Sequence, residues 1–389
     1  MIHELKKRDY QKALPLFKEL DWNLFTSAVI KGTSPGRIYV DRVKDPRTAF
    51  MCTVEGYYLA GYDSNDEFNT SLNKLILERI FAGDTVRKGE TDVAIGFHPD
   101  SWRDKMPIIF RGRLPLTTAR RHYVCTELKA DHWKDQIPKG FQVKRIDEHL
   151  LQTPRLEIPE HLTDWMRTNW GSIDGFLHNG FAFCALGCEQ VVSWSVADCI
   201  SGDACEIGIH THESYRRQGL ATITAAATVS YALSNGFQYV GWHCDEYNLP
   251  SIKTAEKVGF KLERKYIQCY ACPNEAHHLL ETAQTHLRAG RYRETIETYE
   301  KFFATPQEQL PDWLREALPQ ELGVHYFRVA SAKAFVGDYS GAVEYLEKAV
   351  DNGWLYIDFL RDRKEFESLH DTPKWNCILK KIQEKTEES

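Results

Sequence analysis

The stretch Arg216-Arg217-Gln218-Gly219-Leu220-Ala221 lies between two segments with opposite sequence patterns, and it decides how this part of the chain folds. Before it, residues 205–211 show the β-branched alternation that is typical of a strand. After it, residues 220–234 contain no helix breaker, which predicts a helix. A strand, a basic turn with one glycine and a helix N-terminus together favour an anionic phosphate group. The reason is that the first helical N–H groups have no partner within the helix.

Each part of the turn has a physical role in such a site. Gly219 has no Cβ, so its backbone can approach a ligand closely. Arg216 and Arg217 can neutralise a phosphate, and successive backbone N–H groups can form an anion-binding nest. A solvated loop is the alternative interpretation of an arginine-rich turn, so the pattern needs support from the sequence that follows it.

That support comes from the next two elements. Residues 237–244 form a second buried-strand pattern, and residues 248–258 predict a short helix that ends at Gly259-Phe260. This order of elements resembles the GNAT superfamily of acetyl-CoA-dependent N-acetyltransferases. The resemblance rests on residues 216–221, on Asn248 and on Gly259-Phe260. It implies an α+β fold with a mixed, mostly antiparallel sheet flanked by helices, and transfer of an acetyl group from acetyl-CoA to a primary amine of a small molecule.

The resemblance also implies where the cofactor binds. The strands on either side of the predicted helix should diverge, and the pantetheine arm of acetyl-CoA should lie between them like an added strand. Ile209 and Thr211 should bond this arm through their backbone, while Asn248 and Ser251 should lie beside it. The pyrophosphate should be held by the turn and the first helical residues, which are Arg216, Arg217, Gln218, Gly219, Leu220, Ala221 and Thr222.

Acetyl transfer to an amine needs a base, because a protonated amine cannot attack the thioester. Glu206 lies at a position common for that base in the superfamily, and we expect its pKa to be raised. The alternatives are His210, His212 and Asp245. Backbone N–H groups should stabilise the developing oxyanion, and CoA should leave as a thiolate.

One position departs from the pattern of the superfamily. Ala255 stands where many members carry the tyrosine that protonates the departing sulfur. His243, Tyr247 and Ser251 are nearby polar residues that remain open as the acid. The departure also leaves open a second function, a catalytically weak or inactive interaction or sensory protein that binds acetyl-CoA and uses its C-terminal helices to bind a partner.

The N-terminal and central regions form two transferase-like domains. Residues 1–122 predict short strands around a helix without a phosphate turn, which indicates a degenerate GNAT-like domain. This layout resembles a bacterial branch that includes the zwittermicin A resistance acetyltransferases, in which a non-catalytic half precedes the catalytic one. Residues 123–272 form the catalytic domain, with a hairpin about Gly187 beside the cofactor strand. The residues expected near the acceptor amine are Trp170, Ser172, Ser195 and Asp198.

Residues 275–389 predict helices only. Segments 289–301 and 336–348 align with each other, because each has a turn glycine, a tyrosine two residues later and helical spacing of apolar residues. This resembles a tetratricopeptide (TPR) repeat. Two repeats are fewer than a free-standing stack needs, and the aromatic residues look too many for the helices to bury alone. We therefore expect the helices to pack on the transferase or on a second copy of the chain, with a protein-binding groove as the alternative.

Bulk properties limit the partners and the location. The chain has 389 residues, of which 42% are hydrophobic and 27% charged, an ordinary globular composition. Its formal net charge of −6 at pH 7 argues against broad affinity for nucleic acid or acidic membranes. The sequence predicts neither a signal peptide nor a membrane span, so we expect a cytoplasmic protein. The ten cysteines are expected to be buried thiols, and no metal is expected.

Overall fold

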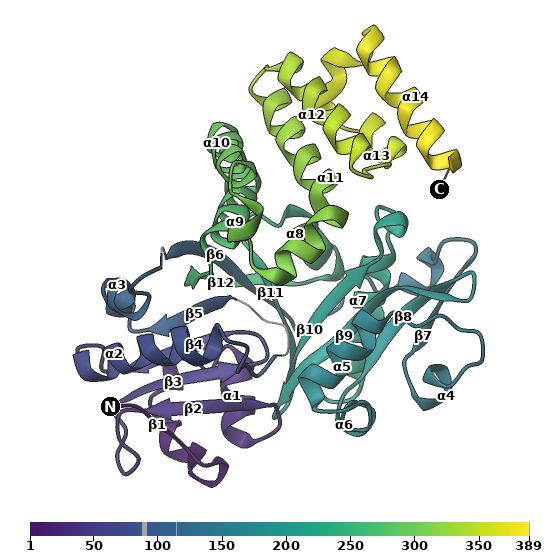
Figure 1. The fold of residues 1–389 in the computed structure, drawn as a ribbon. Coiled ribbons are helices and arrows are strands. Elements are labelled where there is room, and N and C mark those ends of the chain that lie inside the picture. Colours follow the sequence, from purple (N-terminus) through teal and green to yellow (C-terminus); the bar gives the residue numbers. More distant parts are fainter. Residues whose placement is uncertain (88–91, 114, 389) are drawn as a thin grey trace. The chain divides into compact units, whose positions relative to one another are not determined.

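The chain divides into two compact units, Met1–Ala271 and Cys272–Ser389. The computed structural model describes residues 1–87, 92–113 and 115–388. Figure 1 shows that strands dominate the first unit, whereas the second consists of helices. The change of architecture coincides with the point where the sequence changes from alternating to helical patterns.

The first unit is built on one mixed sheet. Its described residues form twelve strands in the order β1-β2-β3-β4-β5-β12-β6-β11-β10-β9-β8-β7. The strands are β1 His3–Glu4, β2 Gly36–Val40, β3 Thr48–Thr53, β4 Tyr57–Gly61, β5 Val93–His98, β6 Leu116–Cys125, β7 Phe141–Arg145, β8 Ala182–Gly187, β9 Gln190–Ser201, β10 Ala204–Thr211, β11 Tyr239–Asp245 and β12 Lys261–Ala271. Within these residues, neighbouring strands are antiparallel except for β4 with β5 and β10 with β11. The predicted mixed, mostly antiparallel sheet is therefore confirmed.

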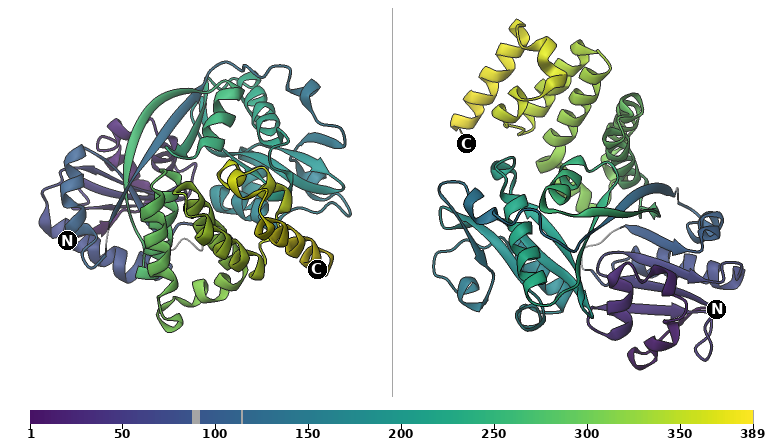
Figure 2. Two further views of the ribbon diagram at one scale, coloured as in Figure 1. Left: turned by 90° about the horizontal axis from the view of Figure 1, so that it is seen from above. Right: turned by 180° about the vertical axis from the view of Figure 1, so that it is seen from behind.

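Helices cover both faces of this sheet, as the views in Figure 2 show. They are α1 Leu24–Lys31, α2 Asp66–Leu75, α3 Met106–Ile109, α4 Glu148–Leu151, α5 Glu160–Trp170, α6 Ile173–Asn179, α7 Leu220–Ser234 and α8 Leu249–Val258. Ile207 of β10 belongs to the same apolar cluster as Val229 of α7. Trp194 of β9 belongs instead to the cluster of Met166 in α5. Because side chains alternate along a strand, α5 and α7 lie on opposite faces of these two strands.

The two halves of the sheet repeat one layout of antiparallel strands, a helix and a parallel strand. In the N-terminal half, β4 and β5 pair from Tyr57 with Ile95 to Ala60 with His98, along nearly the whole of β4. The intervening helix α2 is capped by the side chain of Asn65. Its N-terminus therefore already has a hydrogen-bond acceptor, unlike the helix of an anion site.

The two halves share a single sheet through β6 and β12. Strand β6 pairs with both β11 and β12, and β12 pairs in turn with β5. The boundary expected at residue 122 falls inside β6. Helix α1 of the N-terminal half also packs on β9, where Lys31 Nζ donates to Ser201 Oγ at 2.9 Å. Residues of both halves therefore contribute to one structural unit.

The second unit contains helical hairpins. Its helices are α9 Glu275–Arg288, α10 Tyr292–Phe303, α11 Asp312–Phe335, α12 Tyr339–Asp351, α13 Ile357–Arg361 and α14 Pro373–Glu388. Helix α9 packs on α10, and α11 packs on α12. The turn glycines Gly290 and Gly337 have φ values of +71° and +82°, a left-handed conformation that favours glycine. The two aligned segments thus hold equivalent places, and their identity as TPR repeats stays a prediction.

These helices bury more aromatic surface than we expected from the sequence. Phe302 lies in one apolar cluster of the unit, while Phe327 and Trp354 lie in a second. The rings of Phe327 and Trp354 stack with their centroids 4.1 Å apart. The expectation that the helices cannot bury their aromatic residues is wrong for these three side chains, because the hairpins enclose cores of their own. Phe335, by contrast, is 44% exposed.

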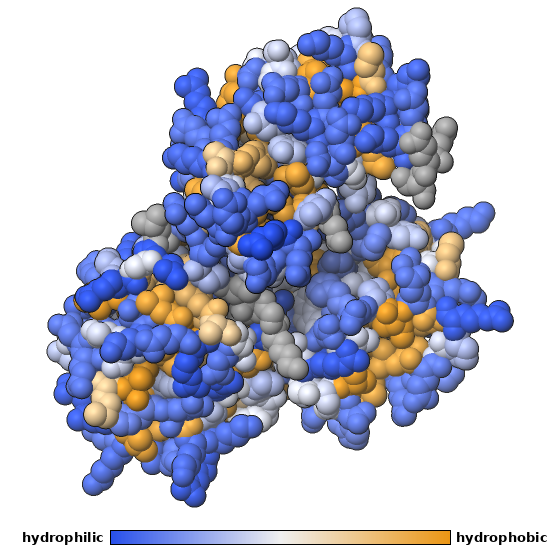
Figure 3. All heavy atoms as spheres, viewed as in Figure 1, coloured by the Kyte–Doolittle hydropathy of each residue, from blue (hydrophilic) through white to orange (hydrophobic). Residues whose placement is uncertain are grey.

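The surface visible in Figure 3 is mostly hydrophilic, with smaller apolar areas between the polar side chains. Among the described residues, no helix combines the length and the apolar character needed to cross a membrane. All ten cysteines are free thiols. Eight of them are buried, as the sequence predicts, whereas Cys188 and Cys377 are exposed.

Candidate active site

The central feature of the site is an open backbone edge between the parallel strands β10 and β11. These strands pair only from Ala204 with Tyr239 to Glu206 with Gly241. Beyond that point, β10 continues to Thr211 paired with β9, and β11 continues to Asp245 paired with β6. The divergence that the sequence resemblance implies is present, and Ile209 and Thr211 lie on the open part of β10.

The open edge leads to the turn that precedes α7. Arg217 and Gly219 both adopt left-handed φ values, +64° and +82°. Gly219 is the N-cap of α7, and no side chain in the described part of the chain caps this end of the helix. A Cβ built on Gly219 would meet no heavy atom within 4 Å among those residues. Arg216 is held beside the strand end, since its Nε donates to Thr211 O at 3.2 Å. The turn therefore offers exposed donors and positive charge at an uncapped helix N-terminus.

Asn248 and Ser251 both have structural partners at the start of α8. The side chain of Asn248 caps the helix by accepting from Ser251 N at 3.3 Å. The hydroxyl of Ser251 accepts from Trp242 Nε1 at 3.0 Å. Ala255 is fully buried, so its position in α8 faces the core. A contact of Asn248 or Ser251 with the cofactor stays a prediction.

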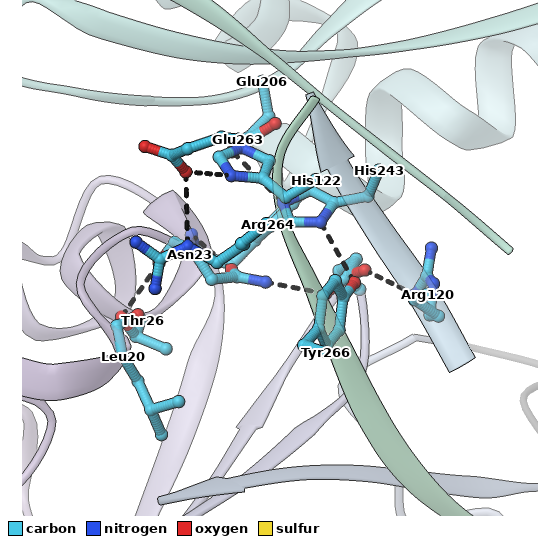
Figure 4. A network of polar contacts seen from close by, with 12 residues as sticks. Leu20, Asn23, Thr26, Arg120, His122, Glu206, His243, Glu263, Arg264 and Tyr266 are labelled. Carbon is cyan, nitrogen blue, oxygen red and sulfur yellow. Dashed lines mark hydrogen bonds and ion pairs between the residues drawn. The ribbon is translucent and has the colours of Figure 1, made fainter. Parts of the chain in front are cut away.

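Glu206 lies in a buried polar cluster (Figure 4). It belongs to the last pair that joins β10 to β11, Glu206 with Gly241, which we call the closed end of the open edge. Its Oε1 is 3.3 Å from Nε2 of His243 and 3.4 Å from Nε2 of His122. On the far side of the rings, His122 Nδ1 lies 2.8 Å from Glu263 Oε2, and His243 Nδ1 lies 3.0 Å from the hydroxyl of Tyr266. The carboxylate occupies the space above Gly241, where a Cβ would come within 2.3 Å of Glu206 Oε2.

The electrostatics of this cluster differ from the expectation for a general base. Burial raises the pKa of Glu206, but the charge of His243 and the close contacts of both histidines outweigh it and lower the pKa to about 2. Burial lowers the pKa of His122, yet its contacts with Glu206 and Glu263 raise it overall. The raised pKa that we expected for Glu206 is therefore wrong, because the sequence did not show its histidine partners.

The cluster has the residue types of a metal site without the matching ring geometry. His122, Glu206 and His243 each offer a ligand atom, and these atoms lie within 4.8 Å of one another. The two imidazole rings, however, lie 4.4 Å apart at an angle of only 16°. Nitrogen lone pairs in the planes of two stacked rings do not converge on one ion, as tetrahedral coordination requires. The cluster is therefore best described as a set of ion pairs between the two carboxylates, Glu206 and Glu263, and the two histidines.

The alternatives to Glu206 lie in different surroundings. His210 stacks on Trp194 at 4.4 Å, and burial, followed by the charge of His161, lowers its pKa to about 4. His212 is exposed after the end of β10. Asp245 Oδ1 lies 3.6 Å from Nε of Arg120.

The four residues expected around the acceptor amine do not lie together in the structure. Asp198 of β9 faces α5, where its Oδ1 accepts from Trp165 Nε1 at 2.6 Å and from Asn169 Nδ2 at 2.9 Å. Ser195 is fully buried, and strand alternation places it on the opposite face, towards α7. Ser172 caps α6 by accepting from Gly175 N. Trp170 is nearer to Asp198, since its Nε1 donates to Ala197 O at 3.0 Å.

The sequence did not reveal which side chains contact the carboxylates of Glu206 and Asp198. His122 and His243 are direct neighbours on β6 and β11, but β6 was not predicted as a strand. Trp165 and Asn169 lie on one face of α5, four residues apart. That helical spacing was the available signal, although nothing in it pointed to Asp198.

Comparisons with known proteins agree with this architecture. The profile of a family described as GNAT acetyltransferase matches residues 14–269. The uncharacterized N-acetyltransferase YdfB of Bacillus subtilis (strain 168) is 27% identical over 272 residues, which cover 70% of this chain and 99% of that protein. The crystal structure of a GCN5-related N-acetyltransferase-like protein from Streptococcus suis 89/1591 shares the fold, with a TM-score of 0.53 and 24% identity over 68% of this chain and 98% of that one. Since the family profile matches well over half of this chain, the chain belongs to the GNAT acetyltransferase family and is an acyltransferase.

Proposed function

We propose that this protein transfers the acetyl group of acetyl-CoA to a primary amine of a small molecule. The observation that carries the proposal is the open edge of β10 leading to the uncapped N-terminus of α7. An extended chain with amide groups can bond such an edge in the manner of an added strand. A diphosphate at the end of that chain would meet the donors and positive charge of the turn.

The proposed cofactor contacts follow the direction of β10. Ile209 and Thr211 bond the pantetheine arm through their backbone. The pyrophosphate is held by the turn and the first turn of α7, namely Arg216, Arg217, Gln218, Gly219, Leu220, Ala221 and Thr222. Asn248 and Ser251 line the start of α8 beside the arm. Glu206, the base predicted from the sequence, lies at the inner end of this track.

We also propose that the N-terminal half does not bind a cofactor. Its parallel strands β4 and β5 pair along nearly the whole of β4, and Asn65 occupies the N-terminus of α2. This agrees with the non-catalytic N-terminal half of the branch that includes the zwittermicin A resistance acetyltransferases.

Calorimetry with coenzyme A and a thiol-release assay test the function together. We expect binding of one CoA per chain, and release of CoA thiol from acetyl-CoA in the presence of at least one amine in a panel of small primary amines. Binding without thiol release would support the catalytically inactive alternative. The absence of CoA binding would contradict both functions.

Truncation after Cys272 tests our proposal that the C-terminal helices pack on the transferase or on a second copy. Trp313, Phe335 and Tyr356 are between 39% and 44% exposed, and covering them would be favourable, at about 25 cal/mol per Å² of apolar surface. We expect the shortened protein to melt at a lower temperature or to change its oligomeric state. If it melts like the full chain and keeps the same state in light scattering, the helices form an independent arm.

A further inference from the structure

A second carboxylate lies at the closed end of the open edge. In the pairing of β9 with β10, Ala197 faces Ile207 and Cys199 faces Glu206, so Asp198 has no partner on β10 and is the extra residue of a β-bulge in β9. The bulge coincides with the last residues that pair β10 with β11. Bulges redirect side chains and end pairing, and this one sets Asp198 beside the point where the edge opens.

The side chain of Asp198 is fixed in a definite orientation. Trp165 Nε1 and Asn169 Nδ2 both donate to Oδ1, and no donor among the described residues reaches Oδ2. A Cβ built on Gly208 would lie 2.6 Å from Asp198 Oδ2 and 2.3 Å from Trp165 Cζ2. The glycine thus lets Oδ2 lie against the backbone of β10 on its open segment. Asp198 is half-buried, on the face of the sheet that α5 covers.

The position of the acetyl group follows from the proposed function. With the pyrophosphate at Gly219, the cofactor arm runs along β10 from Thr211 towards Ile207, a span of about 13 Å at ~3.3 Å per residue. The thioester then lies near the closed end of the edge. Oδ2 of Asp198 lies at this end, over Gly208, whereas Glu206 is turned towards His122 and His243.

We propose that Asp198 takes the proton of the acceptor amine, and that the amine reaches the thioester from the face that α5 covers. This inference rests on the proposed function. The amine nitrogen forms a bond to the acetyl carbon while the carbon–sulfur bond breaks. The amine proton passes to Asp198 Oδ2, CoA leaves with the sulfur electron pair, and the acid later loses its proton to solvent.

The electrostatics of the two carboxylates support this division of roles. Burial raises the pKa of Asp198 to about 8 against the hydrogen bond from Trp165, while the negative charges of Glu206 and Glu55 add to the rise and the positive charge of Arg87 opposes it. A base works best when its pKa is near the working pH. Glu206, with its pKa lowered to about 2, stays ionised between its histidines and holds a proton poorly.

A titration of the tryptophan at this site needs no acceptor. In the full-length protein labelled with ¹⁵N-tryptophan, the indole N–H signal of Trp165, assigned with Trp165→Phe, reports on the carboxylate that it bonds. We expect it to shift with a midpoint near pH 8, and the shift to disappear in Asp198→Asn but to remain in Glu206→Gln. A signal that does not move across neutral pH would overturn the proposal.

Turnover then separates Asp198 from Glu206. We expect Asp198→Asn to lower kcat by about 10²-fold or more, the usual scale of general-base assistance, and to remove the acid limb of its pH profile. The amine is one that supports thiol release in the wild type. Asparagine keeps the size of the side chain and can still accept from Trp165, so the melting temperature and the CoA affinity should be preserved.

Asp164→Asn is the matched control, because Asp164 lies on the same helix, is 57% exposed and pairs with Arg167. It should leave kcat unchanged. Retention of kcat in Asp198→Asn together with its loss in Glu206→Gln would overturn the proposal and return the role to Glu206. Thiol release from no amine in the wild type would overturn it as well, and CoA calorimetry shows in that case whether the cofactor site itself is absent.

Discussion

Gly219→Val is expected to lower the affinity for coenzyme A by about tenfold or more. A charge-assisted hydrogen bond contributes about 1.5–3 kcal/mol, and about 1.4 kcal/mol corresponds to a tenfold change in affinity. The open space beside Gly219 is where we propose that the pyrophosphate lies. A branched side chain would fill that space and would also strain the backbone at φ +82°, moving the first N–H groups of α7 out of line.

The opposite end of α7 offers a matched control for this strain. Gly236 also has a left-handed φ, of +90°, and a Cβ there would also meet nothing within 4 Å in the described structure. Placing valine in a left-handed backbone conformation costs about 1–2 kcal/mol at either position, so both variants should lose similar stability. Only Gly219→Val should weaken CoA binding in calorimetry. Equal affinities for the two variants would remove the pyrophosphate from this turn.

The elements around the turn could be predicted because their signals are local. Strand β10 at Ala204–Thr211 and helix α7 at Leu220–Ser234 match the ranges expected from alternation and from the absence of breakers. The hairpin before them was predicted too, but its turn lies one residue later than expected. Gly187 ends β8, and the turn itself uses Cys188 and Glu189 with φ values of +49° and +63°. Residues other than glycine seldom adopt this conformation, so the sequence gives no reason to expect it there.

The strands that join the two halves could not be predicted in this way. Strand β12, Lys261–Ala271, begins with several charged residues, which hide the alternation of a strand. Strand β6 carries Arg120 and Arg121 in its interior, beside His122. The register of β6 with β11 brings His122 next to His243, and pairing between strands so far apart in the sequence depends on the whole sheet. For that reason the charge and the partners of Glu206 became visible only in the structure.

Glu206→Gln is expected to lower the free energy of unfolding of the first unit by about 3–5 kcal/mol, the usual cost of removing one partner from a buried ion pair. Glu206 and His122 are 2% and 1% exposed, so water cannot replace the lost carboxylate. The pair also stabilises the protonated form of His122, because contacts with Glu206 and Glu263 raise its pKa against the effect of burial. Glutamine has almost the same size as glutamate, so the change removes charge rather than packing.

The sign of the two pKa shifts fixes the pH at which this loss is largest. The pKa of Glu206 is lowered from 4.5 to about 2, so its contribution is complete above pH 4.5 and disappears as the pH falls towards 2. The pKa of His122 is raised from 6.5, so its contribution is complete below pH 6.5 and disappears as the pH rises through the folded value. Both contributions are present together only between these limits.

Urea unfolding of the wild type and the variant, at about pH 5.5 and about pH 8.5, measures this difference. Tryptophan fluorescence is a suitable signal, because the ring of Trp22 lies 5.6 Å from that of His122. The loss should be larger at the lower pH. Glu263→Gln is the control, since Glu263 contacts the same histidine but is 42% exposed, so water can solvate the changed side chain and we expect a smaller loss than for Glu206→Gln. An equal loss for Glu206→Gln at both pH values would contradict this prediction. It would mean that packing and not charge stabilises the cluster, because only a charged pair with His122 gives stability that disappears as the imidazolium loses its proton.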